Sequence, residues 1–268
     1  MKNNKQILVT GGAGFVGTNL IKLLLKKTSY KIVSIDNYTS GTKLNHIRSP
    51  RVKYIKGNTA NISKFVKNPN KIKTIFHFGE FARIYQSFLK MDQCIESNSI
   101  GTNAIFNFCL KHKVKLIYSA TSASLGNKGN DRNLSPYAFT KAKNLELLEN
   151  LKKWFNFKYE VIYFYNVYGP HQICRGQMST VIGIFEDHYK RKEPLPVVLP
   201  GTQTRRFTHI SDTVEICYLA WKKNLCRHYS IASKKSYSVL EVAKIFKSKI
   251  KFLPKRKGER YASALTKM

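Results

Sequence analysis

Apolar residues recur along this chain in two alternating patterns. Short runs rich in Val, Ile and Leu are typical of strands buried in a parallel sheet, and we expect strands near residues 6–10, 31–35, 52–55, 74–78, 115–119 and 160–164. The segments between them repeat apolar residues at helical spacing, which predicts helices near residues 14–26, 79–90, 92–112, 137–154 and 178–190, with another after residue 211. This alternation predicts an α/β fold with a doubly wound parallel sheet.

The alternation becomes irregular after residue 166. Gly169-Pro170 and Leu199-Pro200-Gly201 are turn signals. We therefore expect a larger domain over residues 1–166 and a smaller lobe over residues 167–268, laid across the carboxyl ends of the strands. Residues 261–268 carry no stop signal, which leaves open whether the natural protein continues or is a shortened form.

Composition narrows the class of protein. Apolar residues make up 43% of the 268 positions and are spread along the chain, so we expect a fully folded protein. The longest apolar runs are far shorter than the roughly 18 residues that cross a bilayer, and the first residues lead directly into a strand, which predicts a cytoplasmic protein without a membrane span. The five cysteines are widely spaced, so we expect reduced thiols and no bound metal.

The charge balance is strongly basic. With 47 Lys and Arg against 15 Asp and Glu, the formal net charge is +32, which attracts polyanions and keeps nucleic acid among the partners to consider. The basic residues are mostly Lys and form no block interleaved with aromatic residues. A generally lysine-rich surface is therefore the favoured interpretation, and a substrate that carries a diphosphate fits the same charge.

A glycine-rich turn follows the first predicted strand and opens the first predicted helix. Gly11 permits a tight turn, Gly14 permits the close approach of a pyrophosphate, and Gly17 permits close packing of the helix on the strand. Phe15 and Val16 lie between these glycines, where the N–H groups of a helix start bind phosphate. The turn therefore predicts a dinucleotide site.

Asp36 supports the same site, because it ends the second predicted strand about twenty residues further on. A carboxylate there can accept hydrogen bonds from both hydroxyls of the adenosine ribose and repels a 2′-phosphate, which favours NAD over NADP. Strand, glycines, helix and acid in this order predict a Rossmann-like sheet. The alternative interpretation is a turn cluster followed by a helix-capping acid.

Tyr137 and Lys141 lie one helical turn apart at the start of a predicted helix, so both side chains share one face. Lowering the pKa of a phenol by about three units, to make it a base at neutral pH, takes about 4 kcal/mol. An ammonium about 4 Å away supplies that much at an effective dielectric constant of about 20. We therefore expect Lys141 to lower the pKa of Tyr137, unless the two are an ordinary surface pair.

A cluster of hydroxyl side chains, which includes Thr121 and Ser122, follows the fifth predicted strand. Ligands bind at the carboxyl ends of the strands in open α/β sheets, so either hydroxyl can share a proton with the substrate and Tyr137. We assign Thr121 the catalytic role and Ser122 a substrate contact, and the choice between them stays open. The alternative is a polar loop that caps its own backbone.

Together these motifs resemble the extended short-chain dehydrogenase/reductase family, and within it most closely the UDP-glucose 4-epimerase group of nucleotide-sugar enzymes. The resemblance covers nearly the whole chain and implies that Thr121, Tyr137 and Lys141 are catalytic. This chain has Asn58 where the family usually has an Asp, and it has His77-Phe78-Gly79 where an HLAA-like stretch is common in the family. The cofactor contacts that the resemblance implies, besides those named above, are Asn37, Asn58, Phe78, Ser87 and Asn98.

The resemblance also implies how the substrate is held. Asn166 in the YNVYGP element and Arg205 in the RRFTHISD element match diphosphate ligands, and Arg260 stands where a second arginine is expected. Glu80 and Arg83 add charges near the substrate that the family pattern lacks. Their side chains either contact the sugar and help to select it, or form an ion pair with each other.

The reaction that the resemblance implies is NAD-dependent epimerisation at C4 of a nucleotide-diphosphate sugar, of the UDP-glucose and UDP-galactose type, through a transient 4-keto intermediate. A homodimer paired through the helices at 92–112 and 137–154 is also implied. Dehydratases of the family carry an Asp-Glu pair where this chain has Ser122 and Ala123. An NAD(P)-dependent 4-ketoreductase or a dehydratase stays open as an alternative, as does a non-catalytic RNA-binding or regulatory protein of this fold, a class that tends to lose the Tyr/Lys pair.

Overall fold

The computed structural model describes residues 5–125, 133–258 and 261–262. Within them, the central sheet has seven strands in the order β11-β6-β5-β4-β1-β2-β3, and each neighbouring pair is parallel. The strand order reverses between β1 and β4, which is where a doubly wound sheet opens a crevice at its carboxyl edge. The strands are β1 (Gln6–Thr10), β2 (Lys31–Asp36), β3 (Val52–Lys56), β4 (Ile72–His77), β5 (Lys115–Thr121), β6 (Tyr159–Phe164) and β11 (His228–Ser230). The predicted fold class is confirmed.

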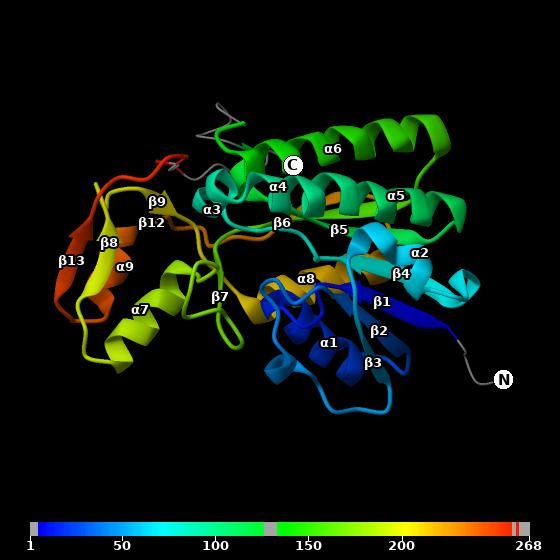
Figure 1. The fold of residues 1–268 in the computed structure, drawn as a ribbon, viewed down its shortest axis with the longest axis horizontal. Helices are drawn as coiled ribbons and strands as arrows, with labels where there is room; N and C mark the ends of the chain where they lie inside the picture. The colour runs from blue at the N-terminus through cyan, green and yellow to red at the C-terminus, as the bar shows by residue number, and fades with distance from the viewer. Residues whose placement is uncertain (1–4, 126–132, 259–260, 263–268) are drawn as a thin grey trace.

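Helices cover both faces of this sheet (Figure 1). On one face lie α1 (Phe15–Lys27) and α8 (Ile210–Lys223), and on the other lie α2 (Ile62–Phe65), α4 (Met91–Ile95), a π-helical segment (Glu96–Gly101), α5 (Thr102–Lys111) and α6 (Pro136–Phe155). Along β1, Ile7 and Val9 pack into the core beneath α1 and α8, whereas Leu8 packs into the core beneath α5 and α6. Burial on both faces explains why Ile7, Leu8 and Val9 are all apolar.

The smaller part of the molecule lies beyond the carboxyl ends of the strands (Figure 1). Its core contains Phe185, Leu195 and Val242. Its elements are β7 (Val167–Tyr168), α7 (Val181–Lys190), β8 (Leu195–Val198), β9 (Thr204–Arg205), β10 (Thr208–His209), β12 (Tyr237–Ser238), α9 (Val239–Ile245) and β13 (Ile250–Leu253). β8 pairs with β13, β9 with β12, and β7 with β10.

The chain passes between the two parts more than once. After β10 it returns to the large sheet, where α8 packs against α1 and β11 pairs with β6 at the sheet edge. It then goes back to the smaller part as β12, α9 and β13. A single cut after residue 166 therefore does not separate the two parts of the structure along the chain.

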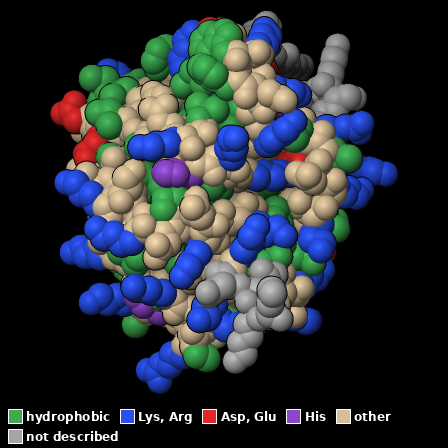
Figure 2. All heavy atoms as spheres, turned by 90° about the vertical axis from the view of Figure 1, so that its right-hand side faces the viewer, with side chains coloured by type: hydrophobic (Ala, Val, Ile, Leu, Met, Phe, Trp, Pro, Cys, Tyr) green, Lys and Arg blue, Asp and Glu red, His purple; other side chains and the backbone are tan. Residues whose placement is uncertain are grey.

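The surface is basic over a wide area. Figure 2 shows Lys and Arg side chains spread over one whole face with few Asp or Glu among them, not gathered into one stripe. No helix among the described residues combines the length and the apolarity needed to cross a membrane. Those residues also hold no group of His, Cys, Asp and Glu side chains arranged to bind a metal ion.

Candidate active site

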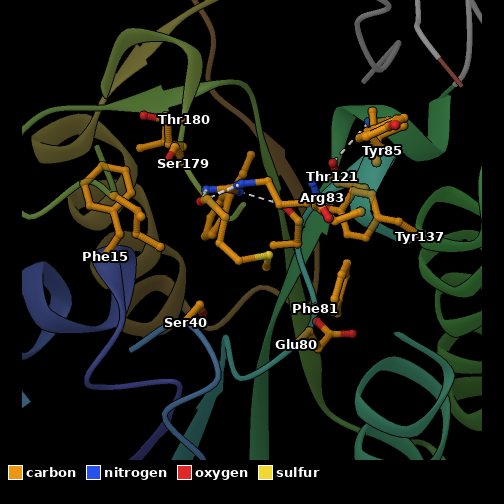
Figure 3. A pocket seen from close by; sticks show the side chains of 18 of the residues that line it. Phe15, Ser40, Glu80, Phe81, Arg83, Tyr85, Thr121, Tyr137, Ser179 and Thr180 are labelled. Carbon is orange, nitrogen blue, oxygen red and sulfur yellow. Dashed lines mark hydrogen bonds between the residues drawn. The ribbon is translucent and has the colours of Figure 1, made fainter. Parts of the chain in front are cut away.

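A cavity of about 910 Å³ lies at the switch point of the sheet, between the carboxyl ends of the strands and the smaller part. Its walls come from both halves of the chain: Figure 3 labels Phe15 and Ser40 on one side, Thr121 and Tyr137 across from them, and Ser179 and Thr180 from the segment before α7. One cavity therefore brings together the glycine turn and the Tyr/Lys helix, which are more than a hundred residues apart in the sequence.

The glycine turn has no room for side chains. Gly11 has a φ of 69°, and a Cβ on it would lie 2.7 Å from the Phe78 carbonyl oxygen. A Cβ on Gly17 would lie 2.2 Å from the Gly11 carbonyl oxygen, so the start of α1 can approach the turn only with glycine there.

The N-terminus of α1 opens into the same cavity. Gly14 is its N-cap and offers no capping side chain, and the first turn holds no acidic residue. Phe15, Val16 and Gly17 line the cavity, so the N–H groups of the first turn and the helix dipole are available to an anion. These residues fit the pyrophosphate of a dinucleotide.

Asp36 ends β2 beside this turn and is 7% exposed. Its Oδ2 accepts a hydrogen bond from the Ala13 N–H at 2.9 Å, and its Oδ1 accepts one from the Tyr38 N–H at 2.8 Å. Burial raises the pKa of this carboxyl, and the two backbone bonds oppose the rise. Each carboxylate oxygen can accept a second bond, and Asp36, Asn37, Asn58 and Phe78 all line the cavity, so this end fits an adenosine ribose.

Asn98 has a different position from the one that the cofactor prediction implies. It is fully buried in the π-helical segment and is absent from the cavity wall. Its Oδ1 accepts a hydrogen bond from the Phe81 N–H at 2.6 Å, and its Nδ2 donates to the Phe81 carbonyl at 3.0 Å. Asn98 therefore holds the loop after β4 from behind, and Ser87 has a similar supporting position because its hydroxyl accepts from the Tyr137 N–H at 3.2 Å.

Tyr137 and Lys141 are placed by the start of α6. Ser135 is the N-cap, and its Oγ accepts a hydrogen bond from the Ala138 N–H at 3.1 Å, while Pro136 occupies the first turn. Tyr137 is 8% exposed and Lys141 is 3% exposed, and both line the cavity. The predicted pair therefore lines the same cavity as the glycine turn.

Thr121, at the end of β5, is the hydroxyl that meets the phenol. Its side chain hydrogen-bonds Tyr137 and so lowers the pKa of the phenol, but burial has the larger effect and raises that pKa to about 12. This outcome differs from the lowered pKa expected from Lys141. Ser122 also lines the cavity and is 3% exposed.

The ammonium of Lys141 is already engaged. It forms an ion pair with Glu80, whose side chain is 2% exposed, and donates to the Ser119 carbonyl at 2.5 Å. Glu80 Oε1 also accepts hydrogen bonds from the hydroxyls of Thr102 and Tyr118, both at 3.0 Å. Glu80 is therefore part of a buried network behind the Tyr/Lys pair, and its partner is Lys141, not Arg83.

Arg83 lies in the cavity wall beside Thr121 and Tyr137 (Figure 3). Its Nε donates to the Met178 carbonyl at 2.8 Å, Nη2 donates to the same oxygen, and Nη1 donates to the Ala82 carbonyl at 2.6 Å. The guanidinium thus links the loop after β4 to the segment before α7. Sequence reasoning could not find this contact, because its acceptor is a backbone oxygen and carries no residue signature.

The predicted diphosphate ligands include two residues of the cavity wall. Asn166 and Arg205 both line the cavity, and Asn166 Nδ2 donates to the Arg206 carbonyl at 3.0 Å. Arg205 is 9% exposed and lies in β9. Arg260 lies outside the described residues.

Comparison with known proteins agrees with this geometry. Residues 7–232 match the model of the NAD dependent epimerase/dehydratase family. ADP-L-glycero-D-manno-heptose-6-epimerase from Brachyspira hyodysenteriae is 29% identical over 260 residues, which cover 90% of this chain and 80% of that protein. dTDP-D-glucose 4,6-dehydratase from Bos taurus is 28% identical over 258 residues, which cover 90% and 71% of the two chains. The structure of UDP-glucose 4-epimerase from Thermotoga maritima with UDP-glucose has the same fold, with a TM-score of 0.89 at 24% identity over 97% of this chain and 89% of that one.

Proposed function

We propose that this chain, which belongs to the NAD dependent epimerase/dehydratase family, epimerises C4 of a nucleotide-diphosphate sugar of the UDP-glucose and UDP-galactose type. One observation carries the proposal: Thr121, Tyr137 and Lys141 share a single cavity with the open N-terminus of α1 and with Arg205. This arrangement can hold a dinucleotide at one end, a diphosphate at the other and a sugar hydroxyl between them at the phenol.

The chain's own residues supply acid–base chemistry and positioning. NAD, which the glycine turn and Asp36 would hold, would supply the hydride chemistry at C4. Tyr137, helped by the Thr121 hydroxyl, removes the proton of the C4 hydroxyl and returns it after the sugar has turned. Asn166 and Arg205 hold the diphosphate meanwhile, so the 4-keto sugar stays captive while its ring presents the other face.

The residues after Thr121 favour epimerisation over dehydration. Ser122 and Ala123 line the cavity, and neither side chain is an acid that can protonate a leaving hydroxyl. Glu80 is the nearby carboxylate, but its oxygens are bonded to Lys141, Thr102 and Tyr118. None of these three residues therefore offers an available acid for the expulsion of water.

The finer assignments follow from the same proposal. Residues 1–166 would bind mainly the cofactor and residues 167–268 mainly the substrate. All five cysteines are unpaired thiols, which supports a cytoplasmic setting. The helical layer of α4, α5 and α6 carries exposed apolar side chains at Ile100 and Trp154, which supports a homodimer through that layer.

The test is an NMR time course of the full-length chain with UDP-glucose or UDP-galactose and NAD. We expect interconversion at C4, and Tyr137→Phe should lower its rate at least about a hundredfold because the proton acceptor is lost. Tyr189→Phe, which changes a phenol that is 54% exposed on α7, is the matched control and should keep the rate. An inert sugar with bound NAD would point to a ketoreductase or another sugar, and a chain that binds no NAD would refute the proposal.

A further inference from the structure

Two opposite charges lie on the loop after β4, next to Tyr137 and Lys141. Glu80 is bonded to the ammonium of Lys141, and Arg83 lies in the cavity wall beside Tyr137 (Figure 3). The two residues are three positions apart in the sequence but have different partners. Both charges are close enough to affect the ionisation of the Tyr137 phenol.

Glu80 offsets the charge of Lys141. The ion pair is buried on both sides, with side-chain exposures of 4% for Lys141 and 2% for Glu80. An ammonium and a carboxylate in contact act on a neighbouring group as a dipole, so their effects on the phenol largely cancel. In agreement with this, the charge of Glu80 raises the pKa of Tyr137, although burial is the larger cause of the rise.

Arg83 keeps its charge. Its hydrogen-bond acceptors are the carbonyl oxygens of Met178 and Ala82, which hold the guanidinium without neutralising it. No carboxylate of the described residues forms an ion pair with Arg83, whereas Glu80 and Lys141 form one with each other. Guanidinium stays protonated throughout the range in which proteins fold, and Arg83 and Tyr137 line the same cavity.

We propose that Arg83 supplies the positive charge that favours ionisation of Tyr137, because Glu80 neutralises the ammonium of Lys141. Arg83 and Glu80 are positioning residues in this scheme, since both act through the phenol. The proposal rests on the proposed function for the role of Tyr137, but the ionisation itself can be measured without any sugar.

The other groups of the described residues that face Tyr137 carry no charge that could replace this one. Cys94 on α4 is a thiol whose pKa burial raises to about 11, and Tyr118 on β5 is a buried phenol whose pKa is raised as well. Thr121 at the end of β5 donates a hydrogen bond. Among the residues that the structure describes, the charged groups around the phenol are therefore Glu80, Arg83 and Lys141.

The first experiment titrates Tyr137 in the purified full-length chain, from the ultraviolet difference spectrum between each protein and its Tyr137→Phe counterpart. Arg83→Gln should move the ionisation up by about one pH unit, because it removes a positive charge. Glu80→Gln should move it down by a similar amount, because Lys141 is no longer offset. The Glu80→Gln/Arg83→Gln double variant should return close to the starting value, because one charge of each sign is lost.

The second experiment separates charge from the mechanical contact of Arg83 with Met178. The acidic limb of the pH profile of kcat for C4 epimerisation should shift upward in Arg83→Gln and recover in Arg83→Lys, which restores the charge but not the fork of N–H groups. If Arg83→Gln changes neither the ionisation of Tyr137 nor the acidic limb of the pH profile of kcat, the proposal is refuted and Arg83 is only a structural link. A double variant that keeps the full shift of Arg83→Gln would refute the role of Glu80. If no sugar is turned over, the proposed function fails while the titration still decides this inference.

Discussion

Thr121 is the residue on which the chemistry of Tyr137 depends most directly, because its hydroxyl hydrogen-bonds the phenol. Thr121→Ala removes that donor from a site where burial already raises the pKa of the phenol to about 12. We expect kcat for C4 epimerisation to fall about a hundredfold, as is common for a lost acid–base partner. The NMR time course measures this loss.

Ser122→Ala is the matched control for this prediction. Ser122 is buried one residue further on and lines the same cavity, so its loss should change kcat less than about tenfold if Thr121 is the hydroxyl that shares the proton. A larger loss in Ser122→Ala than in Thr121→Ala would reverse the assignment that the sequence left open.

The sequence predicts the residues of this site unevenly. Gly11, Gly17 and Asp36 follow from spacing along the chain, since all three lie within one strand–helix–strand unit. The role of Glu80 does not, because its partner Lys141 is 61 residues away and the pairing exists only once the loop after β4 lies against α6. The raised pKa of Tyr137 could not be predicted from the sequence for the same reason, since both burial and Glu80 act on the phenol only in the tertiary structure.

At the scale of elements, the start of α6 is what places Tyr137. Ser135→Ala removes the N-cap hydrogen bond to the Ala138 N–H, which should lower the free energy of unfolding by about 1 kcal/mol and also lower kcat, because the first turn carries the phenol. Thermal unfolding and the NMR time course measure the two effects. Ser135→Thr keeps a capping hydroxyl and should restore both, and an Ala variant with a lower melting temperature but full activity would contradict the coupling.

Strands were predicted better than helices, for a physical reason. The six predicted strands are all present. Five of them are mostly buried and form apolar runs, whereas the edge strand β3 is only partly buried. The helix predicted at 79–90 begins only at Ile84, because Asn98 binds the backbone of Phe81 and keeps residues 79–83 in a loop. The pairing of β8 with β13 joins segments about fifty residues apart, and no local pattern encodes it.

At the scale of the whole molecule, the proposed homodimer can be tested by a substitution in its expected interface. Ile100 lies in the π-helical segment of the α4–α6 layer and is 57% exposed, although it is a large apolar residue. A two-fold interface would bring the same surface of both chains together, so Ile100→Glu would place two carboxylates in an apolar contact, which is strongly unfavourable.

We expect the wild-type chain to sediment as a dimer and Ile100→Glu to sediment largely as a monomer. Leu44→Glu is the matched control, because Leu44 is 93% exposed but lies in the turn at residues 43–45, outside this layer. It should keep the mass of the wild type. A wild-type monomer would refute the proposed homodimer, whereas a dimer that survives Ile100→Glu but not Leu44→Glu would place the contact between chains on the surface around Leu44.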